Sequence, residues 1–387
     1  MKPTLQNTND LAAQPSYRIA LRVPPTPSAS ADKPRPRQRT IPVRASGQSP
    51  ARRAVTLVEL LIVIAIISIL ATLMLGVGAA AGETARRART QSVITRLHAL
   101  MVEHIDGYAN RRVELNQSVE GALDTTFSAA QRRQRGQALA DVRLYGLREL
   151  MLMEMPDRWS DVALADITAA NYPAPVYLER APSLNSLYRR RLRQLNVATN
   201  AKTGMTNTKD EILANQSAEC FYLFIMNATA DGEAPSLFKE SEVGDTDGDG
   251  APEFLDGWGK PIAFLRWAPS YQSDVQMNAR NFLNDNDWRE KAAADHDPLD
   301  IFRRDPYAYR LLPLIVSGGG DEVLGLSAPA DADVPWRASL APFSLANSLY
   351  YLKPFGDYSN RNLAGESLGS GAADNLTNHL IATRIRE

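Results

Sequence analysis

Acidic side chains recur at alternate positions in one short segment of the chain, residues 245–256. Counted from its first residue, carboxylates stand at positions 1, 3, 5, 9 and 12 and a glycine at position 6: Asp245, Asp247, Asp249, Glu253, Asp256 and Gly250. This spacing is typical of a calcium loop, because the ion takes about six to eight oxygen ligands and the glycine allows a tight turn around it. The pattern predicts bound calcium, and an acidic surface turn without metal is the alternative.

The segment departs from an EF-hand in three ways. Asp256 is shorter than the glutamate that usually ends such a loop, and Pro252 stands where an EF-hand places an aliphatic strand residue. The residues that follow, Gly-Trp-Gly-Lys-Pro at 257–261, interrupt any second helix. We therefore expect a single calcium loop and not an EF-hand pair. Three aspartates crowded together without a cation would repel one another, which favours the metal interpretation.

A further group of acidic residues surrounds one histidine: Asp285, Asp287, Asp295, His296, Asp297 and Asp300. These side chains could form a second metal site or, alternatively, paired carboxylates for hydrolysis. The sequence contains neither a phosphate loop nor a His-Glu-x-x-His motif. We therefore expect a protein that is not an enzyme. The single cysteine, Cys220, excludes an intramolecular disulfide, and its apolar neighbours predict a place in the core.

The most apolar segment of the chain carries one carboxylate at its start. Residues 60–82 contain no charged side chain, and Glu59 directly precedes them. At about 1.5 Å per residue, a helix of this length would cover the roughly 30 Å hydrocarbon core of a bilayer. A charged residue within such a helix costs on the order of 2.5–3.5 kcal/mol, so a partner for Glu59 is expected. An ordinary signal anchor with Glu59 at the interface is the alternative.

This segment resembles the N-terminus of type IV pilins and type II secretion pseudopilins. The resemblance rests on the basic residues Arg52 and Arg53, the small Ala54, the apolar Val55 and the run Thr-Leu-Val-Glu-Leu at 56–60. It implies that a prepilin peptidase cleaves between Ala54 and Val55 and methylates the new amino group. Ala54 and Val55 replace the usual glycine and phenylalanine or methionine, but they keep the order of small and then apolar. Glu59 would neutralise the Val55 ammonium of a neighbouring subunit during assembly.

Two later segments resemble major pseudopilins. The Asp-Gly-Trp-Gly-Lys-Pro-Ile run at 256–262 is similar to their Asp-Pro-Trp-Gly-Asn-Pro segment, and residues 315–322 are similar to their late glycine-rich turn. In that family these loops flank a calcium site of the C-terminal sheet. The resemblance implies that the ligands are Asp245, Asp247, Asp249 and Asp256, with Glu253 and Asp321 as further candidates.

Charge is distributed unevenly along the chain. Residues 1–54 hold ten Lys and Arg against two Asp and Glu, a balance of +8, so a net charge of −1 leaves −9 on the remainder. The acidic remainder argues against a nucleic-acid partner, since phosphate contacts need clustered basic residues. The Pro-, Ser- and Arg-rich segment 1–54 is expected to be a disordered leader that processing removes.

The pattern of hydrophobic residues predicts both helices and strands. With it, the resemblance implies an α+β, pilin-like fold, in which a long N-terminal membrane-spanning helix packs on a small antiparallel sheet, with a largely helical insertion. The expected parts are a leader at 1–54, a membrane helix at 55–82, its periplasmic continuation at 83–110, the helical insertion at 111–244, a strand-rich domain with the calcium loop at 245–345 and a loop-like tail at 346–387. Helices are expected near 138–155, 188–193 and 211–226, the last one being either all helix or a helix followed by a strand. Strands are expected at 261–267 and 309–317.

The resemblance implies a non-enzymatic pilin-like subunit in a periplasmic filament of a type II secretion-like or type IV pilus-like system. Its expected partners are prepilin peptidase, other pilin-like subunits and the bacterial inner membrane. The N-terminus would lie in the cytoplasm and the C-terminal domain in the periplasm. The alternative is a membrane-anchored extracytoplasmic calcium-binding protein or hydrolase that does not polymerise.

Overall fold

The computed structural model describes residues 56–162, 175–195, 200, 202–207, 209–228, 234–277, 287–305, 308–327 and 364–380. The chain divides into two units, Met1–Ile64 and Ala65–Glu387. The helical insertion and the strand-rich part therefore belong to one unit, although the sequence pattern suggests separate parts.

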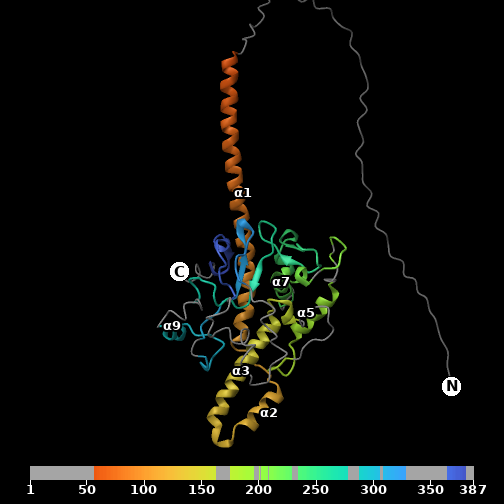
Figure 1. The fold of residues 1–387 in the computed structure, drawn as a ribbon, viewed down its shortest axis with the longest axis vertical. Helices are drawn as coiled ribbons and strands as arrows, with labels where there is room; N and C mark the ends of the chain where they lie inside the picture. The colour runs from red at the N-terminus through yellow and green to blue at the C-terminus, as the bar shows by residue number, and fades with distance from the viewer. Residues whose placement is uncertain are drawn as a thin grey trace, which may run out of the picture. The chain divides into compact units, whose positions relative to one another are not determined.

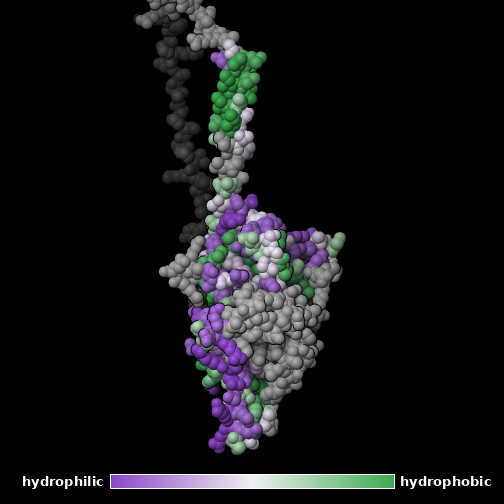
Figure 2. All heavy atoms as spheres, turned by 60° about the vertical axis from the view of Figure 1, so that its left-hand side comes forward, coloured by the Kyte–Doolittle hydropathy of each residue, from purple (hydrophilic) through white to green (hydrophobic). Residues whose placement is uncertain are grey.

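The first helix, α1 (Leu57–Tyr108), is continuous over 52 residues, as the sequence predicts (Figure 1). It begins with a capping box, in which the backbone N–H of Thr56 donates to Glu59 Oε2 at 2.9 Å and the N–H of Glu59 donates to Thr56 Oγ1 at 3.3 Å. The large apolar side chains from Leu57 to Leu70 are 51–78% exposed, and they form the green surface in Figure 2. Farther along, one face of α1 enters the core through Val93 and Leu97.

Within the described ranges, no helix combines the length and the apolarity needed to cross a membrane. The predicted membrane-spanning helix at 55–82 is therefore not confirmed.

Helices dominate the segment between α1 and the acidic loop. They are α2 (Gln117–Thr126), the 3-10 helix η1 (Ala129–Gln131), α3 (Arg132–Glu154), α4 (Trp159–Val162), α5 (Ser183–Gln194), α6 (Lys209–Ala214), α7 (Gln216–Ala228), α8 (Ala234–Leu237) and η2 (Glu240–Glu242). The helices predicted near 138–155 and 188–193 correspond to α3 and α5. Residues 211–226 are helical throughout apart from a break at Asn215, which settles the choice that the sequence left open.

Two small antiparallel sheets follow, which confirms the α+β class. Strand β1 (Val243–Gly244) pairs with β2 (Glu253–Phe254), while β3 (Ala263–Leu265), β4 (Leu314–Ser317) and β5 (Leu376–Thr377) form the second sheet in that order. The short helices α9 (Trp288–Ala294), η4 (Gly319–Asp321) and η6 (Ser370–Ala372) complete the described elements.

The strands differ from their predicted extents. Strands β3 and β4 are shorter than the predicted 261–267 and 309–317. Pro313, directly before β4, cannot donate a ladder hydrogen bond, which limits that strand at its start. The tail predicted to be loop-like at 346–387 contributes β5, which pairs Thr377 with Val316. A two-residue strand has too little alternation for a pattern to reveal it.

Helix α7 connects the helical and strand-rich parts. Its Phe221 stacks on Phe264 of β3, with ring centroids 4.5 Å apart, and meets Phe254 of β2 edge-on at 6.0 Å. These rings lie in the same buried cluster as the inner face of α1 and the end of α3. Aromatic pairs of this kind contribute about 0.5–1.5 kcal/mol beyond their burial. One core thus fixes α7 against both sheets.

The turn after β2 lies directly on α1. The N–H of Gly257 donates to Thr90 Oγ1 at 2.8 Å, and a Cβ atom on Gly257 would fall 2.3 Å from the carbonyl oxygen of Arg86. Only glycine permits this approach of two backbones. Trp258 then donates through Nε1 to Glu83 at 3.2 Å.

Candidate cation site and N-terminal motif

The acidic segment forms the loop of the β1–β2 hairpin. Gly248 and Gly250 adopt positive φ values of 85° and 92°, which allow the tight turn. The carboxylate of Asp245 accepts the N–H groups of both glycines, and Asp249 Oδ1 accepts the N–H of Ala251 at 2.7 Å. Backbone donors therefore fix the orientation of the first and fifth residues of the loop. The second oxygen of Asp249 is buried and has no hydrogen-bond partner among the described residues.

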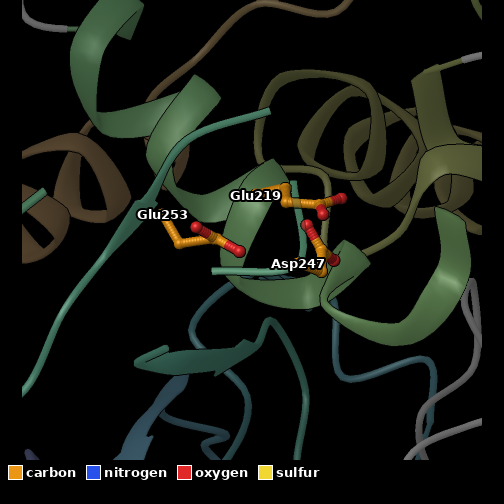
Figure 3. Close-up of side chains that lie close together, drawn as sticks. All are labelled: Glu219, Asp247 and Glu253. Atoms are coloured by element: carbon orange, nitrogen blue, oxygen red, sulfur yellow. The ribbon is translucent and has the colours of Figure 1, made fainter. Parts of the chain in front are cut away.

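The structure gathers four of the six predicted calcium ligands. Asp245, Asp247 and Asp249 each offer a carboxylate oxygen, all within 4.8 Å of one another. Asp247 also belongs to a second group of the same dimensions, together with Glu253 and Glu219. Figure 3 shows the side chains of these three residues close together. This arrangement offers a hard cation several oxygen ligands at once.

The other two predicted ligands, Asp256 and Asp321, belong to neither group. Asp256 Oδ1 accepts the N–H groups of Trp258 and Lys260, at 2.8 and 2.9 Å, and its Oδ2 accepts the Ser317 hydroxyl at 2.7 Å. Its carboxylate thus holds the turn that follows the loop. Asp321 is exposed and accepts the N–H of Val323 at 2.9 Å.

Sequence reasoning missed Glu219, which comes from α7 and not from the loop. It lies 34 positions before Glu253, so no local spacing connects them. The signal that could have found it is a glutamate within an otherwise apolar helical stretch. Its side chain is 1% exposed, and its Oε2 accepts the indole N–H of Trp159 at 2.7 Å. Its Oε1 has no hydrogen-bond partner in the described part of the chain.

Burial and like charge both make this cluster unfavourable without a cation. Burial raises the pKa of Glu253 to about 7 and that of Asp249 to about 6. It also raises the pKa of Asp247. The pKa of Glu219 lies well above its usual value because of burial and then because of Asp249, Asp247 and Glu253. No Lys or Arg within the described ranges forms an ion pair with these carboxylates. A divalent cation would compensate their charge.

The acidic residues near His296 have partners of their own. Asp300 accepts the backbone N–H groups of Arg304 and Asp305, both at 2.8 Å, and lies 3.3 Å from His296 Nε2. Asp295 pairs with Arg310 at 2.8 Å, and the buried Asp297 pairs with Arg148 at 2.7 Å. Asp285 lies outside the described residues, and the exposed Asp287 joins no metal-sized cluster among those that are described. A second metal site here stays a prediction.

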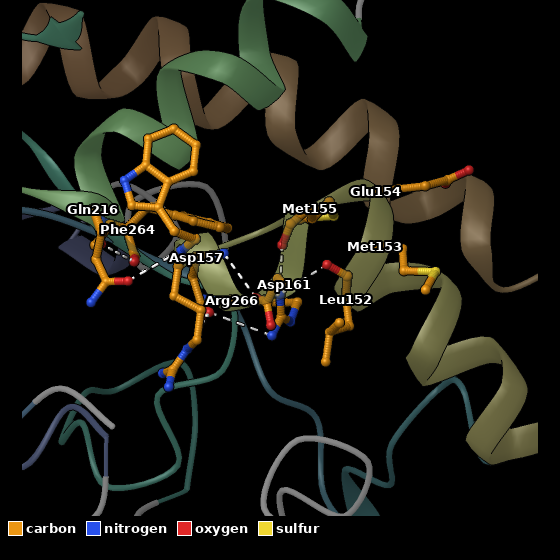
Figure 4. Close-up of polar contacts among 12 residues, drawn as sticks. Leu152, Met153, Glu154, Met155, Asp157, Asp161, Gln216, Phe264 and Arg266 are labelled. Carbon is orange, nitrogen blue, oxygen red and sulfur yellow. Dashed lines mark hydrogen bonds and ion pairs between the residues drawn. The ribbon is translucent and has the colours of Figure 1, made fainter. Parts of the chain in front are cut away.

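A second buried polar cluster joins α4 to β3 (Figure 4). Arg266 is fully buried, and its guanidinium donates to Asp161 Oδ2 at 3.0 Å, to Asp157 Oδ1 at 3.4 Å and to the carbonyl oxygen of Met155 at 2.7 Å. Arg158 pairs with Asp157 at 3.5 Å. Although burial raises the pKa of Asp157, Arg266 and Arg158 outweigh that effect and lower it. We call Asp157, Arg158, Asp161 and Arg266 the arginine–aspartate network.

At the N-terminus, the cleavage and methylation residues Ala54 and Val55 lie outside the described residues. Glu59 is described, and its carboxylate accepts hydrogen bonds from the N–H and hydroxyl of Thr56, at 2.9 and 3.2 Å. Within one chain, this side chain therefore serves as a helix cap. The side chain is exposed at the start of an apolar helix.

Comparison with known proteins identifies one segment. Residues 49–75 match the family model described as the prokaryotic N-terminal methylation motif. The match includes Ala54, Val55 and Glu59, and it indicates a pilin-like N-terminus of the kind that prepilin peptidase processes. Neither the comparison with curated proteins nor that with solved structures found a match.

Proposed function

We propose that this chain is a non-enzymatic pilin-like subunit that is cleaved between Ala54 and Val55 and assembled through the apolar start of α1. The methylation motif at 49–75 is the observation that carries the proposal. The filament would belong to a type II secretion-like or type IV pilus-like system. The chain would cross the inner membrane once, with its C-terminal domain in the periplasm.

The exposed apolar surface of α1 supports assembly through this helix. The large side chains from Leu57 to Leu70 are each more than half exposed, and the only charged residue among them is Glu59. A surface of this kind must be covered by lipid or by other apolar helices. In the filament, the Glu59 carboxylate would pair with the methylated Val55 ammonium of a neighbouring subunit.

Substitution of Glu59 separates this role from helix capping. Glutamine serves in a capping box nearly as well as glutamate but carries no charge. We therefore expect Glu59→Gln to leave the helix intact, and we expect both Glu59→Gln and Glu59→Ala to abolish co-assembly. Crosslinking of subunits in membranes measures assembly, and Glu103→Gln, at an exposed position of the same helix, is the matched control.

The two alternatives give different outcomes. If Glu59→Gln assembles and functions normally, Glu59 is a cap, and an anchored protein that does not polymerise becomes the better interpretation. Mass spectrometry of the mature N-terminus tests the processing step directly. The proposal requires methylated Val55, and a functional protein that begins upstream of Arg52 would contradict it.

We further propose that the acidic loop binds calcium through Asp245, Asp247, Asp249 and Glu253. The gathered carboxylates and their raised pKa values support this site. At a calcium concentration 100-fold above Kd, binding would stabilise the folded protein by about 2.7 kcal/mol. Thermal unfolding of the full chain in detergent should show this increase, and Asp247→Asn should remove it.

A further inference from the structure

The proposed calcium loop lacks the ligand that normally completes such a site. At the twelfth position, Asp256 is 2% exposed, and both of its oxygens accept hydrogen bonds from the turn at 258–260 and from Ser317. Turning this carboxylate toward the ion would break all three contacts. A calcium ion in the loop therefore needs an oxygen ligand from elsewhere.

Glu219 occupies a suitable place. One of its carboxylate oxygens lies within 4.8 Å of ligand oxygens of both Asp247 and Glu253. The side chain is 1% exposed, yet its Oε1 has no hydrogen-bond partner among the described residues. Buried carboxylate oxygens without partners are rare in folded proteins. A cation bound between Glu219, Asp247 and Glu253 would satisfy the free oxygen of Glu219.

We propose that Glu219 is a ligand of the loop's cation and that the cation thereby joins α7 to the acidic loop. This inference rests on the calcium loop of the proposed function. It adds a connection between the helical insertion and the strand-rich part of the chain. Glu219, from a different element, would supply the oxygen ligand that Asp256 at the twelfth position does not provide.

The contacts of Glu219 extend this connection to α4. Trp159, the first residue of α4, donates its indole N–H to Glu219 and its backbone N–H to Gln216 Oε1, the latter at 3.2 Å. Two residues later, Asp161 bonds to Arg266 of the arginine–aspartate network. Calcium binding would therefore order α4 and α7 as well as the loop.

Calcium calorimetry on the full chain in detergent tests the ligand role. We expect Glu219→Gln to raise the Kd for calcium at least tenfold. Glu154→Gln is the matched control, because Glu154 is also 1% exposed but pairs with Arg111 and lies in neither carboxylate group. It should destabilise the protein and leave the Kd within about twofold. If Glu219→Gln does not fold, Glu219→Asp keeps the charge and should weaken binding by shortening the side chain.

Terbium luminescence tests the location of the ion. Trp159 lies in contact with Glu219, so a Tb³⁺ ion bound there should emit when tryptophan is excited and should be displaced by calcium. We expect Trp159→Phe to lose most of this emission while terbium still binds. Emission that is unchanged in Trp159→Phe would place the ion away from Glu219 and overturn the inference.

Hydrogen exchange separates a ligand from a merely structural glutamate. In the wild type, calcium should slow amide exchange in both the loop at 245–254 and α7. In Glu219→Gln saturated with calcium, protection should remain in the loop and disappear from α7. Calcium protection of α7 in this variant, or wild-type affinity, contradicts the inference.

The outcomes for the two proposals can be told apart. If the wild type binds no calcium, the loop proposal itself fails. If Asp247→Asn abolishes binding and Glu219→Gln does not, only the role of Glu219 fails.

Discussion

The acidic cluster and the arginine–aspartate network both bury carboxylates, but they compensate the charge differently. In the network, Arg266 and Arg158 face Asp157 and Asp161, so two cations match two anions. The cluster brings five carboxylates together without an ion pair from any described Lys or Arg, as its two overlapping groups show. The chain itself supplies cations to the network, although Asp161 Oδ1 there is buried without a hydrogen-bond partner among the described residues. The cluster would take its cation from solution under the proposed function. The two regions meet at Trp159 and Asp161, which lie on the same short helix.

Removal of the central cation of the network should have the largest effect. Arg266→Met leaves Asp157 and Asp161 buried without their main partner, and we expect a loss of about 3–5 kcal/mol in the free energy of unfolding. Urea unfolding measures this loss, and excess calcium should not restore it. Arg180→Met is the control, because that side chain is 80% exposed in its pair with Glu114 and should change stability by less than about 1 kcal/mol. If calcium restored the stability of Arg266→Met, the cation would also compensate the aspartates of the network, which would contradict the distinction between the two regions.

The second-largest effect is expected in the pH dependence of stability, which should distinguish the acidic cluster from the arginine–aspartate network. Burial raises the pKa of Glu253 from near 4.5 to about 7 in the folded, calcium-free protein. Between these values the folded protein holds a proton that the unfolded chain has released. The free energy of unfolding therefore falls as pH rises through this window, on the order of 3 kcal/mol for Glu253 alone.

Calcium requires ionised carboxylates, so it reverses this trend. The stability difference between calcium-loaded and chelator-treated protein should be small near pH 5 and should grow toward pH 8. Burial, and then Arg111, lowers the pKa of His104 to about 4, and burial lowers that of His379 to about 4. The titration of these histidines makes the free energy of unfolding rise with pH, opposite to the effect of Glu253. This contribution is the same in calcium-loaded and chelator-treated protein, so it cancels in the difference. A difference that does not change with pH would contradict the proposed ligand set.

The smallest effect concerns the amide that lies among the carboxylates. Asn215 Nδ2 donates to Asp247 Oδ2 at 3.0 Å and to Glu253 Oε1 at 3.2 Å. We expect Asn215→Ala to cost about 1–2 kcal/mol in chelator and less in calcium, because the cation then compensates the same oxygens. The control is Asn227→Ala, whose amide donates to the carbonyl oxygen of Leu223 and should matter equally in both conditions. Equal losses at Asn215 in both conditions would contradict a cation at this position.

The sequence predicted what local patterns determine. Helical periodicity located α1, α3, α5 and α7, and alternate aspartates located the loop that the structure folds into a cluster. Local patterns could not predict the role of Asp256, because the hydrogen bond between its carboxylate and Ser317 depends on how two distant turns meet. Glu219 was missed for the same reason. The network was also missed, since Arg266 and Asp161 lie 105 positions apart.

The glycine after the acidic loop places the proposed cation site close to the first helix. Asp256 ends the loop, and the N–H of the next residue, Gly257, is bonded to Thr90 of α1. A single peptide bond therefore joins the end of the loop to the residue that contacts α1. Because no Cβ atom separates the two backbones, a movement of the loop would change this contact directly. Ion occupancy could thus be transmitted to the element that the chain would present to its neighbours.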